Sequence, residues 1–195
     1  MRNIRDTRPR IQSGEKKMKT LAINGSHRTG NTEAMLKKIL DGAASKDAKI
    51  ELINLKDKKV EMCKGCMACE TTGTCLITDD FPKILEKLFK ADVLILGSPN
   101  YFNNVSALMK GFFDRMNAHW QNPALKGKKV VLVMPGGNSP ESIEKGMSAF
   151  SEFPRICKME VIEKVTPHVD GPKEAQENKE LMQKCFSLGE KLASL

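Results

Sequence analysis

Four of the six cysteines in this 195-residue chain lie within thirteen residues, in the pattern C-x2-C-x2-C-x5-C. Thiolates so close along a chain converge easily on one small inorganic group, and Gly65 and Gly73 let the backbone fold back around it. Four thiolates are the usual ligands of an iron–sulfur cluster. The pattern therefore indicates a [4Fe–4S] cluster, with a ligand set of Cys63, Cys66, Cys69 and Cys75.

Other interpretations of these cysteines stay open. The last gap is longer than in a bacterial ferredoxin, and Leu76 rather than proline follows it, so the segment is not a ferredoxin repeat. Zinc sites more often use two C-x2-C pairs about a dozen or more residues apart, so the spacing favours a cluster over zinc. Free thiols, or disulfides formed on oxidation, are the third interpretation.

Short apolar runs alternate with amphipathic stretches along the rest of the chain. Strands are expected over residues 20–24, 50–55, 93–97, 129–134 and 159–166. Helices are expected after the first strand, after a cap at Asp79 or Asp80, and over about 105–118, 140–153 and 173–193. This alternation predicts an α/β fold with a parallel sheet. Residues 18–195 read as a single domain, interrupted by a cysteine segment over about residues 58–78.

Three loops of unusual composition follow predicted strands, at residues 25–32, 98–104 and 135–138. In open parallel sheets, ligands bind beyond the carboxyl ends of the strands, so these loops are expected to meet. The first loop opens a helix, and its N–H groups, hydroxyls and Arg28 suit a phosphate. It matches neither G-x-G-x-x-G nor a Walker A loop, and a well-capped helix start is the alternative.

The second loop holds the chain's one tyrosine, Tyr101, among asparagines at a strand end. A flat aromatic ligand could lie against this backbone, with the amides meeting its polar edge. Gly136 and Gly137 could let the third loop approach the same ligand. Ordinary turns are the alternative for both loops.

Taken together, residues 18–195 resemble the NADPH-dependent FMN reductase superfamily and, more closely, the iron–sulfur flavoproteins within it. The resemblance is carried by residues 25–33, which look like its phosphate loop, and by residues 97–102 with Lys110, Asp114 and Arg115, which look like its flavin-ring loop and following helix. The cysteines, running on to residues 79–80, look like its cluster motif.

The resemblance implies a flavodoxin-like, doubly wound, five-stranded parallel sheet of order 2-1-3-4-5, with helices on both faces. It implies that the FMN phosphate is held by Ser26, Arg28, Gly30, Asn31 and Thr32. The flavin ring would be held by Pro99, Asn100, Tyr101, Phe102 and Asn103. The ring or its ribityl chain would be held by Pro135, Gly136, Gly137 and Asn138.

The expected function is a flavin-dependent oxidoreductase that passes electrons between a reduced donor, a ferredoxin or NAD(P)H, and an acceptor through FMN and the cluster. A cluster-free NAD(P)H-dependent reductase of flavins, quinones or nitro compounds is the alternative. A non-redox binding protein is a third possibility, which the FMN-type loops argue against. The resemblance also implies a homodimer or tetramer.

Composition limits the remaining choices. Residues 1–17 hold six basic and two acidic side chains, which is half of the net charge of +8. No aromatic residue interleaves these charges and no helical apolar stripe accompanies them, so a disordered tail is expected rather than a nucleic-acid or membrane arm. The natural start could equally be Met18. No apolar run approaches the roughly 18 residues of a membrane span, and the cytoplasm is the expected location.

Overall fold

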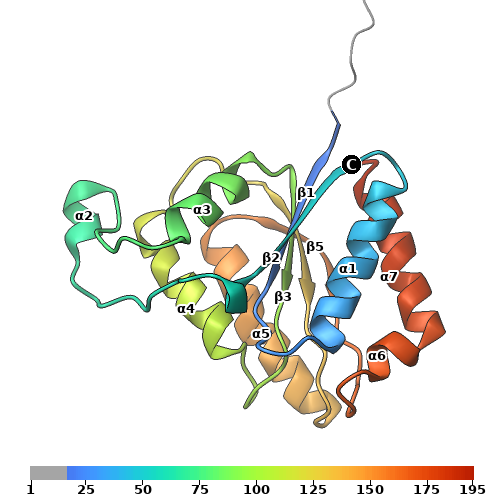
Figure 1. Cartoon of the computed structure of the whole chain (residues 1–195). Helices are drawn as coiled ribbons and strands as arrows, with labels where there is room; N and C mark the ends of the chain where they lie inside the picture. The colour runs from blue at the N-terminus through green and yellow to red at the C-terminus, as the bar shows by residue number, and fades with distance from the viewer. Residues whose placement is uncertain (1–16) are drawn as a thin grey trace, which may run out of the picture.

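The computed structural model of the chain describes residues 17–195 (Figure 1). The prediction of a basic tail over residues 1–17 therefore lies outside the described residues, apart from Lys17. Five strands form one parallel sheet in the order β2-β1-β3-β4-β5, which confirms the predicted doubly wound sheet of order 2-1-3-4-5. Their bounds are β1 Lys19–Asn24, β2 Lys49–Asn54, β3 Val93–Gly97, β4 Lys129–Val133 and β5 Glu160–Val165.

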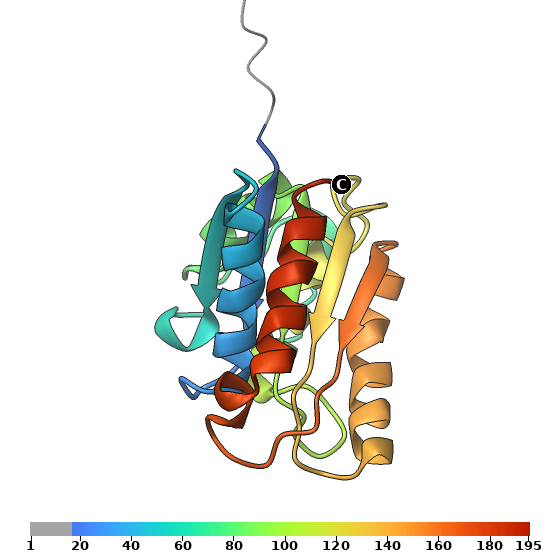
Figure 2. The ribbon, with the colours of Figure 1, turned by 90° about the vertical axis from the view of Figure 1, so that its right-hand side faces the viewer.

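Helices cover both faces of the sheet (Figures 1 and 2). One face carries α1 (Asn31–Ala44) and α7 (Lys179–Leu192), which pack along each other, with the short α6 (Glu174–Glu177) at one end. The other face carries α3 (Phe81–Lys90), α4 (Ala107–Arg115) and α5 (Pro140–Ile156).

The alternation of side chains along each strand explains the two cores. Leu21 and Ile23 of β1 pack with α3, α4 and α5, whereas Ala22 between them packs with α1 and α7. In β3, Leu94 faces the first of these cores and Ile95 faces the second. Central strands that are buried on both faces read as continuous apolar runs, which is why the sequence identified them so clearly.

Three local features differ from the sequence-based expectations. The helix expected over residues 173–193 is two helices, because the Asn178 side chain accepts a hydrogen bond from the Leu181 N–H and starts α7 anew. The helix expected over residues 105–118 ends as α4 at Arg115 and continues as a 3-10 turn, Met116–Ala118. The cysteine segment contains a short helix, α2 (Ala68–Thr72), that was not predicted. Within residues 17–195, no helix has the length and apolar character that crossing a membrane requires.

Candidate functional site

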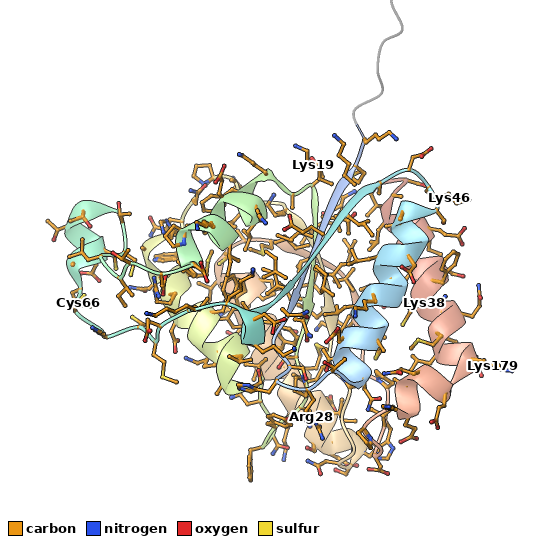
Figure 3. All side chains as sticks on the ribbon, in the orientation of Figure 1. Lys19, Arg28, Lys38, Lys46, Cys66 and Lys179 are labelled. Carbon is orange, nitrogen blue, oxygen red and sulfur yellow. The ribbon has the colours of Figure 1, made fainter. Side chains whose placement is uncertain are left out.

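The loop from β1 into α1, residues 25–32, forms one wall of a pocket at the carboxyl edge of the sheet. The Ser26 hydroxyl donates to the Arg28 carbonyl at 3.1 Å and accepts from the Arg28 N–H at 3.2 Å. The Ser26 N–H donates to Asn24 Oδ1 at 3.0 Å. The loop is therefore a tight turn fixed by its own polar groups, while the side chain of Arg28 is exposed at the pocket (Figure 3).

The first turn of α1 is open to an anion. Gly30 occupies the N-cap position, and no side chain caps this helix, so the capped start considered above does not describe it. The first N–H groups of a helix have no partners within it, and together with the helix dipole they attract negative charge. Gly30 is also required sterically, because a Cβ there would lie 2.7 Å from the Pro172 carbonyl oxygen.

Asn31 joins two walls of the pocket. Its Nδ2 donates to the Gly171 carbonyl at 2.7 Å, and its Oδ1 accepts from the Ala175 N–H at 3.0 Å. The Asn31 side chain is therefore occupied in holding the loop after β5, and its backbone N–H belongs to the uncapped first turn of α1.

The loop after β3, residues 98–104, is fastened to the end of β4. The N–H groups of Ser98 and Asn100 donate to the carbonyls of Val133 and Pro135, each at 3.0 Å. Further along, the backbones of Tyr101 and Asn104 pair with each other at 2.9 and 3.0 Å. The loop thus starts as a buried wall and ends as an exposed turn.

The turn holds two residues in the left-handed region, Phe102 at φ 49° and Asn103 at φ 59°. Bulky residues rarely adopt this conformation, and such strain is found most often at functional sites. Phe102 is fully exposed, at 100% of its reference area. The Asn103 side chain accepts a hydrogen bond from the Ser142 hydroxyl at 2.6 Å. Both predicted ring contacts therefore lie at the rim rather than in the lining.

Asn100 carries an unsatisfied acceptor in the pocket wall. Its Nδ2 donates to Ser142 Oγ at 3.0 Å. Its Oδ1, beside Gly146 of α5, is buried and has no hydrogen-bond partner within residues 17–195. Buried polar atoms are nearly always paired, but this oxygen lies against α5 and has almost no accessible surface, so it faces the protein interior rather than the pocket. The Asn100 side chain therefore ties the loop after β3 to α5.

A fourth wall, residues 169–172, was not predicted from the sequence. The Val169 N–H donates to the Gly136 carbonyl at 2.9 Å, and a Cβ on Gly137 would lie 2.4 Å from Asp170 Oδ1. The N–H groups of Asp170 and Gly171 both donate to the Glu174 carboxylate, at 2.7 and 2.9 Å. Because these residues follow the fifth parallel strand, their position at the shared carboxyl edge could have identified them.

The four loops enclose about 110 Å³, below the roughly 300 Å³ of a typical small-molecule pocket, so only part of an FMN-sized ligand is enclosed. We call this space the flavin pocket. Its predicted lining residues are Ser26, Arg28, Gly30, Asn31, Thr32, Pro99, Asn100, Tyr101, Pro135, Gly136 and Gly137. Its other lining residues are Val169, Asp170, Gly171 and Pro172. The predicted contacts outside the lining are Phe102, Asn103 and Asn138.

The cysteine segment projects from the side of the sheet that carries α3 and α4 (Figure 1). Its helix α2 is flanked by two left-handed residues, Met67 at φ 58° and Gly73 at φ 68°. Figure 3 places Cys66 and Arg28 at separate edges of the molecule, so the segment does not adjoin the phosphate end of the flavin pocket of its own chain. Cys63 and Cys66 are exposed, whereas Cys69 and Cys75 are half-buried.

These thiols are the right donors for an iron–sulfur cluster, but the described fold does not gather them. Within residues 17–195, no three Cys, His, Asp or Glu side chains lie close enough together to hold a metal ion. Two sulfurs already receive hydrogen bonds, Cys63 from the Gly65 N–H at 3.5 Å and Cys69 from the Asn117 amide at 3.8 Å. Hydrogen bonds to sulfur help to set the reduction potential of an iron–sulfur cluster. The four thiols therefore fit a cluster as ligands, but binding one would require the segment to bring them together.

The chain matches the family model of NADPH-dependent FMN reductases over residues 18–172. It therefore belongs to this family of flavodoxin-like, flavin-dependent oxidoreductases, and the resemblance noted from the sequence is confirmed. Family membership supports FMN as the cofactor.

Its relatives include proteins named for a cluster. The chain is 39% identical over 121 residues to an iron–sulfur flavoprotein of Archaeoglobus fulgidus, a match covering 62% of this chain and 60% of the relative. It is 36% identical over 146 residues to an iron–sulfur flavoprotein of Methanocaldococcus jannaschii, covering 74% and 76%. A flavodoxin from the Archaea superposes with a TM-score of 0.60 at 20% identity, over 91% of this chain and 97% of the flavodoxin. This last likeness concerns the fold alone.

Proposed function

We propose that this chain transfers electrons between a reduced donor and an acceptor, using FMN in the flavin pocket and a [4Fe–4S] cluster on the four clustered cysteines. FMN, when bound, exchanges electrons in pairs or singly, and a cluster exchanges one at a time. A protein that holds both can therefore couple a two-electron donor to a one-electron acceptor, or the reverse. The protein's part is to bind, orient and shield these groups.

The observation that carries the flavin half is the convergence of four loops on one pocket beside the uncapped start of α1. Thr32 and the first N–H groups of α1 would bind the phosphate, with Arg28 closing over it as a counter-charge. Ser26, whose hydroxyl is bonded to the Arg28 backbone, would hold the loop in shape around it. Pro99 and Asn100, whose loop lines the pocket, would border the polar edge of the ring. Tyr101 would lie against the ring, with Phe102 bordering it at the rim.

The cluster half is supported by the four thiols, by the two hydrogen bonds to sulfur, and by relatives named as iron–sulfur flavoproteins. Its proposed ligands are Cys63, Cys66, Cys69 and Cys75. The segment's open arrangement is consistent with metal-coupled folding, in which the bonds to metal supply the order that the free segment lacks.

The proposed donors are a ferredoxin or NAD(P)H. No second nucleotide-binding fold accompanies the sheet in the described part of the chain, so NAD(P)H would stack directly on the flavin. The net charge of +8 favours an acidic carrier, although half of it lies in residues 1–17. A cytoplasmic homodimer or tetramer is proposed on the resemblance alone.

A second candidate is a cluster-free NAD(P)H-dependent reductase of flavins, quinones or nitro compounds. The dispersed thiols of residues 63–75 favour it, because nothing in the described fold requires metal there. The two candidates share FMN and the flavin pocket, so they differ only in what the cysteine segment holds.

Anaerobic purification followed by assays of flavin, iron and acid-labile sulfide separates the candidates. About four irons and four sulfides per FMN, with a broad absorbance shoulder near roughly 400 nm, supports the cluster. Flavin bands without iron or sulfide in fresh anaerobic protein leave the cluster-free reductase. Absence of stoichiometric FMN would overturn both.

A further inference from the structure

We infer that Arg115 is the positioning residue of the cysteine segment, because one buried guanidinium holds both ends of the loop that carries the four thiols. The inference deepens the cluster half of the proposed function and rests on it for its purpose. Its physical basis is independent of any bound metal.

The chain enters and leaves the cysteine segment through two backbone stretches that lie side by side, residues 59–61 and 79–80. The Asp80 N–H donates to the Lys59 carbonyl at 2.9 Å, and the Lys59 N–H donates back to Asp80 Oδ2 at 2.9 Å. The Glu61 N–H donates to Asp79 Oδ2 at 2.8 Å. Residues 62–78, with all four thiols, therefore form a loop closed at this base.

Arg115, the last residue of α4, lies against the base from the protein side. Its side chain and that of Asp79 are both 0% exposed. Nη1 donates to the Glu61 carbonyl at 2.9 Å and also to Asp79, while Nη2 donates to Asp79 Oδ1 at 3.2 Å. The Phe81 ring lies 4.6 Å from the guanidinium carbon. One side chain thus grips the entering stretch through Glu61 and the leaving stretch through Asp79.

Stability alone does not account for this arrangement. Burying an ion pair costs several kcal/mol of desolvation per ion, and apolar side chains often fill such a site equally well. Arg115 Nε, moreover, is buried without a partner within residues 17–195. What the pair provides, and an apolar replacement would not, is a fixed geometry between the two ends of the loop.

The opposite end of α4 is fixed at the flavin pocket. Ser106 caps the helix, its hydroxyl donates to the Gly25 carbonyl of the phosphate loop, and its N–H donates to Ser98 Oγ at 2.8 Å. Helix α4 therefore connects the walls of the flavin pocket to the base of the cysteine loop. Through Arg115, this helix sets where the thiols stand relative to the flavin.

The test compares FMN-loaded protein before and after anaerobic loading with iron and sulfide. In the metal-free state, Arg115→Met is expected to speed hydrogen exchange at the Lys59 and Asp80 amides at least about tenfold, the factor that 1.4 kcal/mol supplies. These two amides bond to each other's residues rather than to Arg115, so they report closure of the base. Iron bound per FMN is expected to fall well below that of the wild type, with flavin affinity unchanged.

Two further variants separate positioning from folding. Arg115→Met with Asp79→Leu removes both buried charges and is expected to restore the melting temperature while exchange stays fast and iron stays low. Arg115→Lys keeps the positive charge but loses the forked pair of N–H donors, so its exchange rates and iron content are expected to lie between those of the wild type and Arg115→Met. The matched control is Arg155→Met, which breaks the exposed ion pair with Glu152 and is expected to change neither readout.

Unchanged exchange in Arg115→Met, or wild-type exchange and iron in the double variant, would overturn the inference. If the wild type takes up no iron, the cluster half of the proposed function fails, and the exchange result still decides whether Arg115 positions the loop.

Discussion

The flavin pocket and the cysteine segment are built on opposite principles. The pocket is made by four loops that leave neighbouring strands, so the sheet itself brings its walls together. The cysteine segment leaves the sheet altogether and contains no strand. The first site is therefore a consequence of the fold, whereas the second depends on how one loop is closed.

The hydrogen bonds show the same contrast. Backbone groups of Ser98, Asn100 and Gly136 bond to carbonyls at residues far along the chain. Within the cysteine segment, by contrast, Thr72 bonds to Ala68 and Thr74 nearby, and the bond from the distant Asn117 amide to the Cys69 sulfur is long, at 3.8 Å. Segments held by local, exposed hydrogen bonds open at low free-energy cost. The walls of the pocket are thus fixed by long-range bonds, whereas the cysteine segment can open locally at low cost.

The largest effect is expected when a proposed cluster ligand is removed. Cys66→Ser leaves three thiols, so iron per FMN should fall from about four to near zero while flavin per chain stays unchanged. Iron and flavin assays on anaerobic protein measure both. The matched control is Cys185→Ala, at a cysteine of α7 that is buried in the core on the opposite face of the sheet; this variant should keep its iron. Loss of flavin together with iron in Cys66→Ser would show that the two regions are not independent.

The converse change is Gly30→Ala in the flavin pocket. Its Cβ would meet the Pro172 carbonyl at 2.7 Å, so the phosphate loop or residues 169–172 must shift. FMN affinity should fall about tenfold to a hundredfold, as 1.4–2.8 kcal/mol of misfit would produce. Flavin fluorescence titration of the stripped protein measures it.

The matched control for that change is Gly111→Ala in α4, where a Cβ meets nothing within 4 Å. This variant should bind FMN normally and gain about 0.5–1 kcal/mol of stability, because alanine favours a helix interior over glycine. Equal affinities for the two alanine variants would contradict the steric argument at Gly30.

The sequence predicted the parallel sheet and three of the four pocket loops, because apolar runs and loop composition are local signals, whereas the order of the strands came from the family resemblance. It did not predict residues 169–172, because the composition of Asp170, Gly171 and Pro172 resembles an ordinary turn; only their position after the predicted strand over residues 159–166 marks them as a pocket wall. It also placed Phe102, Asn103 and Asn138 among the flavin contacts, whereas the structure has them outside the lining of the pocket. Whether a loop residue lies in the lining or at the rim depends on the exact path of the backbone, which the sequence does not reveal.

The role of Arg115 was missed for a different reason. Asp114 and Arg115 are adjacent in the sequence and of opposite charge, which suggests a local ion pair, yet adjacent helical residues do not face each other. In the structure Asp114 pairs with Lys110, and Arg115 reaches Asp79, 36 residues away. The available signal was the apolar stripe through Met109 and Phe112, whose helical spacing places residue 115 on the buried face.

A smaller effect is expected at the joint between the two regions. Ser106→Ala removes the cap of α4 and the bond to the Gly25 carbonyl, which should cost about 1–2 kcal/mol and lower FMN affinity severalfold. Thermal melts and flavin titration measure the two effects. Ser139→Ala is the matched control, since Ser139 caps α5 through the Ser142 N–H without contacting the phosphate loop. It should lower stability comparably and leave FMN affinity unchanged.

The smallest effect concerns acid and the base of the cysteine segment. Burial lowers the pKa of His119, whose ring stacks on Phe81 beneath Arg115. An unfolded histidine takes up its proton near pH 6.5, so stability is fully present above that pH and is lost as pH falls from about 6.5 through the lower folded pKa.

Melting temperatures of FMN-bound protein between pH 7.5 and 5.5 should therefore fall more steeply in the wild type than in His119→Gln. The flavin pocket does not contain His119, so FMN affinity should show the same pH dependence in both proteins. Protection of the Lys59 amide, taken relative to its intrinsic exchange rate at each pH, should fall in acid only where His119 is present, because protonation disturbs the ring packing behind the base. If the melting temperatures of the two proteins fell equally with pH, the protonation of His119 would not contribute to the stability of the base.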